Sequence, residues 1–307
     1  MTLQDKYLNP FTDFGFKKLF GSEPNKDLLI DFLNQLLPSH HRIQDLTFAR
    51  NEQVGRSEFD RRAIFDVFCI SRSGERFIVE MQRAKQDYFR DRSVYYASFP
   101  IQEQALRGEW NFKLAPVYLV GILDFVFAED KDDPQVCHRV QLKDQLNRVF
   151  YDKLTFIYLE MPKFTKIEDE LETGFDKWLY VLKHLPDLTD RPARLQERVF
   201  AHLFEAAELG KFTREEWVSY DESLKVYRDL KNVMDTAIRE ASEKSKAEGH
   251  AEGHAAGHAA GHAEGLAEGE LKKAQDIARQ ALEEKLPLSL ITKLTGLTEE
   301  EIATLQD

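Results

Sequence analysis

Cysteine is scarce in this sequence, whose 307 residues include only Cys69 and Cys137. Neither belongs to a C-x-x-C motif, and neither has a histidine neighbour at a spacing typical of zinc sites. Each lies in a separate strand-like run, so we expect both to be reduced core residues. The sequence therefore argues against a scaffold held by disulfides and against a cysteine-based zinc module.

Long apolar runs are also absent. No stretch approaches the roughly 20 apolar residues that a membrane-spanning helix needs. The N-terminal segment MTLQDKYLNPFTDF lacks the basic and then apolar regions of a signal peptide. We therefore expect a cytoplasmic protein with no membrane partner. We also expect no small-molecule cofactor. A chain of this length can bury a full core and is expected to form more than one domain.

Positive charge is in short supply, since 42 Lys and Arg face 54 Asp and Glu and the net charge is −12. The deficit is not evenly spread. Residues 1–110 hold 16 basic and 16 acidic residues, so the remaining 197 residues carry 26 against 38. A neutral N-terminal part with local basic patches can bind a polyanion, which keeps nucleic acid open as a partner.

Among the features that are present, the stretch AIFDVFCISRSGERFIVEMQ (residues 63–82) places two acidic residues inside apolar runs. Asp66 lies in AIFDVFCI and Glu80 lies in RFIVEMQ. Turn-forming residues 71–74 separate the runs, so the segment is typical of a β-hairpin. Folding it about the middle of the turn brings Asp66 opposite Val79 and within one residue of Glu80. Both strands are apolar on both faces, so we expect the acids to be shielded from solvent.

Two buried carboxylates that lie close together repel each other and must be protonated, paired with cations or bound to a metal. Mg²⁺ prefers oxygen ligands and is commonly held by one or two carboxylates and a substrate phosphate. Gln82 lies on the same face of its strand as Glu80, so its amide could orient a metal-bound water. The alternative is that nearby arginines neutralise the acids, namely Arg61, Arg62, Arg76 and Arg83.

The periodicity around the hairpin indicates an α/β fold. We expect a short helix that starts at Pro10 or Thr12, a helix over residues 25–37, a short strand over 43–49, a helix from Asp87 to Gly108 that Pro100 kinks, and a buried strand over 114–124. Two further strands are expected over residues 136–142 and 154–160. From residue 167 onward the period becomes helical.

Basic and aromatic residues alternate directly after the hairpin. The basic residues are Arg83, Lys85, Arg90 and Arg92, and the aromatic residues are Tyr88, Phe89, Tyr95 and Tyr96. Such a mixture is typical of a surface that grips DNA phosphates and contacts a base or sugar. The alternative is an ordinary helix with a solvated face and aromatic core positions.

A low-complexity repeat marks the C-terminal part. Residues 248–269 carry glycine at every fourth position, followed in four of the six repeats by histidine. A flexible linker, a helix that drives self-association and a histidine metal site are all open, and we favour self-association. Beyond the repeat, two short helices around residues 295–297 resemble a helix-turn-helix. Residues 299–301 are all glutamate, which favours docking onto protein over docking onto DNA.

Three segments together resemble the Rpn family of recombination-promoting nucleases, which are also described as transposases of the PD-(D/E)XK nuclease superfamily. They are NPFTDFGFKKLFGSEPNKDLLIDFLNQLL, the pair FDVFCI and FIVEMQ, and SVYYASFPIQEQALRGEWNFKLAPVYLVGIL. The resemblance covers roughly residues 9–125. The glycine repeat and the short helical C-terminus are also similar to members of this family.

The resemblance implies a restriction-endonuclease-like fold, in which helices flank a mixed sheet, and DNA cleavage that depends on Mg²⁺ or another divalent cation such as Mn²⁺ or Ca²⁺. Asp66 then corresponds to the metal-binding aspartate and Glu80 to the second acid. Gln82 stands where many superfamily members have lysine, although glutamine is usual in this family. Asp13 is expected to approach the site, and Lys17 or the adjacent Lys18 is a candidate for the missing cation.

We therefore expect a nuclease-like domain over residues 1–165, a helical region over 166–246, the repeat over 247–270 and a C-terminal helical segment over 271–307. The expected function is DNA cleavage with low sequence specificity that promotes recombination or transposition-like exchange. The alternative is a non-catalytic module on the same fold that binds DNA or protein.

Overall fold

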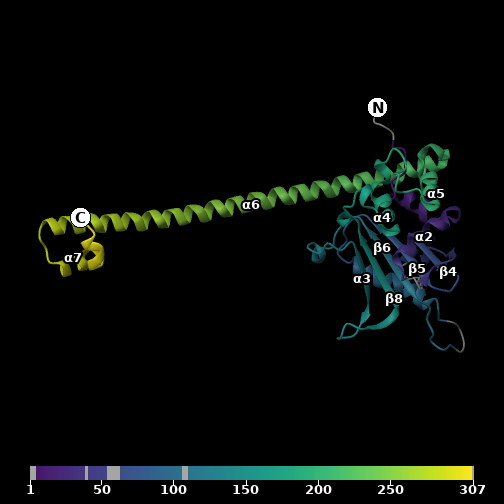
Figure 1. Cartoon of the computed structure of the whole chain (residues 1–307), viewed down its shortest axis with the longest axis horizontal. Coiled ribbons are helices and arrows are strands. Elements are labelled where there is room, and N and C mark those ends of the chain that lie inside the picture. Colours follow the sequence, from purple (N-terminus) through teal and green to yellow (C-terminus); the bar gives the residue numbers. More distant parts are fainter. Residues whose placement is uncertain (1–4, 39–40, 54–62, 106–109, 306–307) are drawn as a thin grey trace. The chain divides into compact units, whose positions relative to one another are not determined.

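The computed structural model describes residues 5–38, 41–53, 63–105 and 110–305. Two compact units make up the chain, residues 1–234 and residues 235–307. Helix α6 (Arg214–Glu283) contains the boundary between them (Figure 1). Within the described residues, no helix has the length and apolar character needed to cross a membrane. The division into four segments expected from the sequence remains a prediction.

The first unit is built on a six-stranded mixed sheet (Figure 1). Its strands follow in the order β1 (Leu46–Phe48), β4 (Val67–Ser71), β5 (Arg76–Gln82), β6 (Val117–Leu123), β8 (Val149–Glu160) and β7 (Cys137–Lys143). Strands β5, β6 and β8 are parallel to one another, and the other neighbours are antiparallel. A separate two-stranded pair joins β2 (Glu52–Gln53) to β3 (Ala63–Ile64).

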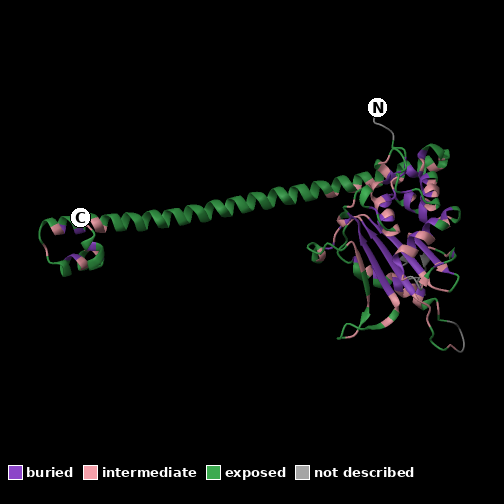
Figure 2. Ribbon diagram, viewed as in Figure 1, coloured by how far each residue is buried: buried purple, intermediate pink, exposed green. Residues whose placement is uncertain are grey.

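Helices cover both faces of the sheet, which explains why β6 is buried along its whole length (Figure 2). One face packs against α1 (Asp13–Phe20), α2 (Lys26–Leu36), α4 (Gly174–His184) and α5 (Arg198–Ala207). The other face packs against α3 (Phe89–Gln102). This arrangement confirms the expected restriction-endonuclease-like fold class.

The alternation of β5 divides its side chains between the two faces. Phe77, Val79 and Met81 join the core under α1 and α2. Ile78 joins the core under α3, so Glu80 and Gln82 lie on the α3 face. Gly121 of β6 is the register partner of Glu80. A Cβ atom at Gly121 would lie 3.1 Å from the Tyr158 ring and 3.5 Å from the Phe89 ring, so glycine lets α3 approach the sheet closely beside Glu80.

The predicted hairpin is present, but its register differs by one residue from the sequence-based expectation. Val67, and not Asp66, lies opposite Val79. The turn is longer by one residue because Gly74 adopts a left-handed conformation, with φ = +97°, and the Gly74 N–H donates to the Ser71 carbonyl at 3.0 Å. The shift brings Asp66 alongside Glu80.

Helix α3 begins later than expected. Asp87 does not cap it, because Tyr88 occupies the N-cap position and the first helical residue is the buried Phe89. Pro100 lies inside the helix as predicted, and the helix ends at Gln102. The expected end at Gly108 lies outside the described residues.

The expectation that both strands of the hairpin are covered on both faces is wrong for the apolar run that precedes β4, since the Ile64 side chain is 61 % exposed. Both cysteines are free, and burial raises the pKa of the Cys69 thiol to about 12. They are therefore reduced, as expected.

The second unit contains the rest of α6 and two short helices, α7 (Leu288–Thr295) and α8 (Glu299–Ala303). Gly296, at φ = +73°, ends α7, and Thr298 with Glu301 forms a capping box at the start of α8. Residues 248–269 are helical and exposed on every side. The repeat is therefore helical, and its role as a linker or in self-association remains a prediction.

Candidate active site

Backbone hydrogen bonds hold the two predicted acids together. The Asp66 N–H donates to Glu80 Oε1 at 3.1 Å, and the Met81 N–H donates to Asp66 Oδ2 at 2.8 Å. Asp66 lies at the bend before β4, where the register of the hairpin fixes its place beside Glu80. We call these two residues the acid pair.

Burial disfavours the ionised form of both acids. The Glu80 side chain is 6 % exposed, and burial, together with the charge of Asp66, raises the pKa of Glu80 to about 8. Burial also raises the pKa of Asp66, although the Met81 N–H opposes this effect. The acid pair therefore lacks enough positive charge nearby to stabilise two carboxylates.

The oxygen atoms of the acid pair fit a hard divalent cation. Among the described residues, Asp66 Oδ1 and Glu80 Oε2 accept no hydrogen bond, so one oxygen of each carboxylate is available as a ligand. A bound cation would favour the ionised form of both acids and so offset the effect of burial on their pKa values. Asp66 and Glu80 are the residues that would hold such a cation.

The described arginines do not neutralise the acid pair by direct contact. Arg76 points toward the hairpin turn, where its Nη1 lies 3.5 Å from the Gly74 carbonyl. Arg83 is close enough for its charge to lower the pKa of Asp66, but within the described part of the chain it forms no ion pair. Arg61 and Arg62 lie outside the described residues, so their part of this alternative remains a prediction.

Helix α1 brings two of the predicted site residues near Asp66. Lys17 Nζ forms an ion pair with Asp13 at 2.9 Å. The charge of Asp13 raises the pKa of Asp66, and the charge of Lys17 lowers it. The charge of Lys17 also acts on Glu80. Lys18 points elsewhere and forms an ion pair with Glu216. Lys17 is therefore the lysine of this helix that lies near the acid pair.

Both ends of the Gln82 side chain are engaged. Gln82 Nε2 donates to the Ala84 carbonyl at 2.8 Å, and Gln82 Oε1 accepts a hydrogen bond from Arg92 Nη2. Arg92 Nη1 also donates to Gln86 Oε1 at 2.6 Å. Because Gln82 follows Glu80 by two residues on the same face of β5, this contact brings the Arg92 guanidinium toward Glu80, and the charge of Arg92 lowers the pKa of Glu80.

The other predicted basic residues differ in their surroundings. Arg90 Nη2 lies 3.2 Å from Asp130 Oδ2 and 3.6 Å from Glu129 Oε2, so acids neutralise it. Lys85 is exposed and lines a pocket of about 690 Å³ that Tyr88 and Arg92 also line. The structure therefore brings Arg83 and Arg92 toward the acid pair and directs Arg90 away from it.

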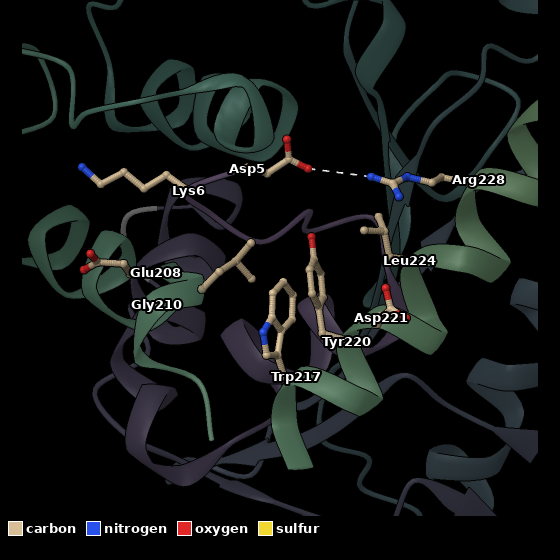
Figure 3. Close-up of a pocket in the computed structure, with 10 residues that line it drawn as sticks. Asp5, Lys6, Glu208, Gly210, Trp217, Tyr220, Asp221, Leu224 and Arg228 are labelled. Carbon is tan, nitrogen blue, oxygen red and sulfur yellow. Dashed lines mark ion pairs between the residues drawn. The ribbon is translucent and has the colours of Figure 1, made fainter. Parts of the chain in front are cut away.

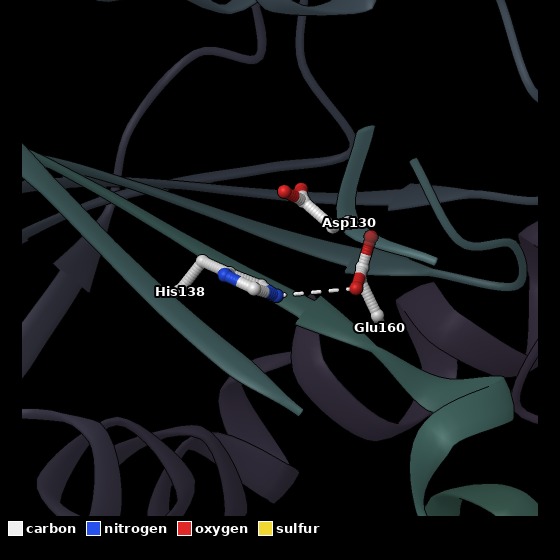
Figure 4. Close-up of side chains that lie close together, drawn as sticks. All are labelled: Asp130, His138 and Glu160. Atoms are coloured by element: carbon white, nitrogen blue, oxygen red, sulfur yellow. Dashed lines mark hydrogen bonds and ion pairs between the residues drawn. The ribbon is translucent and has the colours of Figure 1, made fainter. Parts of the chain in front are cut away.

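A second polar cluster, which the sequence did not suggest, lies at the end of β8 (Figure 4). The ligand atoms of Asp130, His138 and Glu160 lie within 4.8 Å of one another. The fully buried Glu160 accepts from the Phe127 N–H at 2.6 Å and lies 2.5 Å from Lys163 Nζ. Because Lys163 already neutralises Glu160, this cluster is satisfied without a metal and stabilises the end of β8.

A pocket of about 920 Å³ lies elsewhere in the first unit, between the N-terminal segment and the start of α6 (Figure 3). Trp217 and Tyr220 stack in it with ring centroids 5.9 Å apart, and Asp5 forms an ion pair with Arg228 at 3.8 Å. Its lining includes neither acid of the acid pair. We therefore do not assign catalysis to it.

Comparison with known families identifies the two parts of the chain. A family model described as PD-(D/E)XK nuclease family transposase matches residues 10–237. A second one, described as the C-terminal HTH domain of the Rpn/YhgA-like nuclease family, matches residues 265–307. Neither the curated proteins nor the solved structures include a match to this chain. The first match spans well over half of the sequence and contains the acid pair, so the chain belongs to the PD-(D/E)XK nuclease family transposases.

Proposed function

We propose that this protein is a Mg²⁺-dependent DNA endonuclease of low sequence specificity, whose cleavage promotes recombination or transposition-like DNA exchange. The observation that carries the proposal is the acid pair, two carboxylates held side by side with raised pKa values and one oxygen each available to a cation. Mn²⁺ or Ca²⁺ are alternative occupants. Nicking of a supercoiled plasmid with and without Mg²⁺ tests the proposal.

The reaction is hydrolysis of a phosphodiester, in which water adds to phosphorus and the bond to one ester oxygen breaks. Bound Mg²⁺ supplies Lewis-acid chemistry at the scissile phosphate. Asp66 and Glu80 hold it, and the hydrogen bonds from Asp66 N and Met81 N fix the orientation of their carboxylates. Asp13 and Lys17 adjust the charge around Asp66.

In this proposal, basic residues near the acid pair bind the DNA phosphates. The charge of Arg83 lowers the pKa of Asp66, and the charge of Arg92 lowers the pKa of Glu80. Lys85, which lies between these arginines in sequence, is exposed. Their contacts go to phosphates, which carry no sequence information. Arg90 is expected to contribute less because two acids already pair with it.

Removing two phosphate contacts is expected to weaken the salt dependence of DNA binding. In the Arg83→Ala/Lys85→Ala variant, the slope of log K against log salt should fall in magnitude by about two, since each contact contributes about 0.9. Fluorescence anisotropy in metal-free buffer measures this without cleavage. Lys211→Ala/Lys225→Ala is the matched control, because these lysines pair with surface acids. Equal slopes in all three proteins would mean that Arg83 and Lys85 do not contact DNA.

The rival function is a non-catalytic module that binds DNA or protein. The C-terminal HTH domain is consistent with a DNA partner. Its second helix, however, begins with three glutamates at positions 299–301, which would repel phosphate. Docking of this domain onto protein therefore remains our proposal. DNA binding without any cleavage by the full chain would favour the rival function.

Self-association through the repeat is a separate part of the proposal. Glycine costs about 1 kcal/mol relative to alanine in a helix, so the six glycines of residues 248–269 disfavour an isolated helix. In a helix, a spacing of four places these glycines along one gently winding stripe, and a second copy that packs against it would compensate for this cost. The four histidines have no cysteine near them in the sequence, so specific metal binding by the repeat is less favoured.

Truncation tests the role of the repeat. A chain of residues 1–240 retains the whole first unit, so it should fold and run as a smaller species in light scattering than the lost mass explains. Replacing the six repeat glycines with alanine in the full chain keeps the helix and removes the close approach of backbones, and should also reduce the assembly. If the truncated and full-length chains have the same oligomeric state, the repeat does not drive self-association.

A further inference from the structure

The Gln82 amide is not placed to act on a water molecule by itself. Its Nε2 donates to the Ala84 carbonyl and its Oε1 accepts from Arg92, and the side chain is 8 % exposed. A neutral amide with both ends occupied cannot supply positive charge to a phosphate. The hydrogen bonds of Gln82 fix the position of the Arg92 guanidinium.

Arg92 is held as a cation without a partner anion. Its guanidinium donates to Gln82 and Gln86, and its carbon atom lies 5.0 Å from the Phe89 ring centroid and 5.5 Å from that of Tyr96. Within the described residues no carboxylate forms an ion pair with Arg92. The rings and amides thus orient the guanidinium while its full charge is retained.

The surroundings of Arg92 lead from the acid pair to open solvent. On one side Arg92 contacts Gln82, which lies two residues after Glu80 on the same face of β5, and the charge of Arg92 lowers the pKa of Glu80. On the other side it lines the 690 Å³ pocket together with Lys85 and Tyr88. A guanidinium has five N–H donors, and two of them serve Gln82 and Gln86. The remaining donors can therefore bind a phosphate that enters beside Glu80.

We propose that Arg92 is a catalytic residue that binds the scissile phosphate, and that Gln82 is a positioning residue that acts through Arg92. This inference rests on the proposed nuclease function. Arg92 would supply, from α3, the positive charge that a lysine at position 82 supplies in many members of the superfamily. Its two-pronged hydrogen bonding to phosphate oxygens would stabilise the charge that develops as the phosphodiester bond breaks.

The test begins with Arg92→Met and Arg90→Met, measured by single-turnover plasmid nicking at saturating enzyme with Mg²⁺. Methionine keeps an apolar stem against the rings below each arginine. Arg92→Met should lower the cleavage rate by about 10²-fold to 10³-fold, as expected for loss of one transition-state donor. Arg90→Met should cleave within a few-fold of the wild type. Equal rates in the two variants would overturn the proposal.

A double-mutant cycle separates positioning from direct action. Gln82→Ala should slow cleavage in the wild-type background and should have no further effect in Arg92→Met. Gln82→Lys should restore cleavage of Arg92→Met at least about tenfold, because the ammonium then enters from β5 on the same face as Glu80. If Gln82→Ala costs the same factor in both backgrounds, Gln82 acts without Arg92 and the inference is wrong.

Different outcomes contradict the nuclease function and the role of Arg92. A wild-type chain that does not cleave with any divalent cation contradicts the nuclease function. A wild-type chain that cleaves, with an additive cycle and no rescue by Gln82→Lys, contradicts only the role of Arg92.

Discussion

Replacing either acid of the acid pair with alanine is expected to lower Mg²⁺-dependent DNA cleavage by about 10³-fold or more. Each carboxylate offers one oxygen to the cation, so replacing either acid removes one of the two ligands that the acid pair provides. A factor of 10³ corresponds to about 4 kcal/mol of lost transition-state stabilisation. Single-turnover nicking of a supercoiled plasmid by Asp66→Ala and Glu80→Ala measures the effect.

The fold should survive these substitutions, because removing one of two repelling buried acids relieves a cost. Asp66→Asn and Glu80→Gln test the charge alone, since each amide oxygen can still accept the existing backbone hydrogen bond. The matched control is Asp124→Asn. Asp124 follows β6, where burial raises its pKa to about 6 while the charges of Lys231 and Lys183 oppose the shift. Cleavage at the wild-type rate by Asp66→Ala or Glu80→Ala would show that the acid pair is not the site.

The metal-free protein is expected to lose stability as pH rises from about 4.5 to about 8. Glu80 has a folded-state pKa of about 8, above the ordinary value of 4.5, so in this range the unfolded chain ionises while folded Glu80 stays protonated. The unfolded state then binds fewer protons, and the free energy of unfolding falls with pH until it levels off above the folded pKa. The raised pKa of Asp66 acts in the same direction.

A shift of this size corresponds to several kcal/mol at most, so the melting temperature of the metal-free protein should fall by about 5 °C or more across this range. Glu80→Gln cannot ionise at this position and should show a smaller fall. Added Mg²⁺ binds the ionised carboxylates, so its stabilising effect should grow with pH. Identical pH profiles for wild type and Glu80→Gln would contradict the buried, charge-repelling environment assigned to Glu80.

Local signals in the sequence predicted most of the fold. Thr12 caps α1 by accepting from the Gly15 N–H at 3.0 Å, and α2 ends just before Pro38, as capping and proline rules require. A capping box of Thr213 and Glu216, a pattern that the sequence shows directly, forms at the start of α6 with hydrogen bonds of 2.9 and 3.2 Å. These features depend on neighbours in sequence, so the sequence is enough to predict them.

The details of the site depend on contacts that sequence spacing does not encode. The register of the hairpin required the left-handed conformation of Gly74, which adds one residue to the turn. The contact between Gln82 and Arg92 joins a strand to a helix ten residues away, and it depends on how α3 packs over Gly121. The cluster around Glu160 depends on the pairing of β7 with β8, which the linear pattern of either strand does not reveal.

Nicking of a supercoiled plasmid by the purified full-length chain, with Mg²⁺ and with a chelator, tests directly whether this protein is a metal-dependent DNA endonuclease. We expect conversion to the open-circular form with Mg²⁺, none with the chelator, and none with Asp66→Ala under either condition. Binding of the plasmid without nicking in Mg²⁺ or Mn²⁺ would contradict the account and would assign the chain to the non-catalytic alternative.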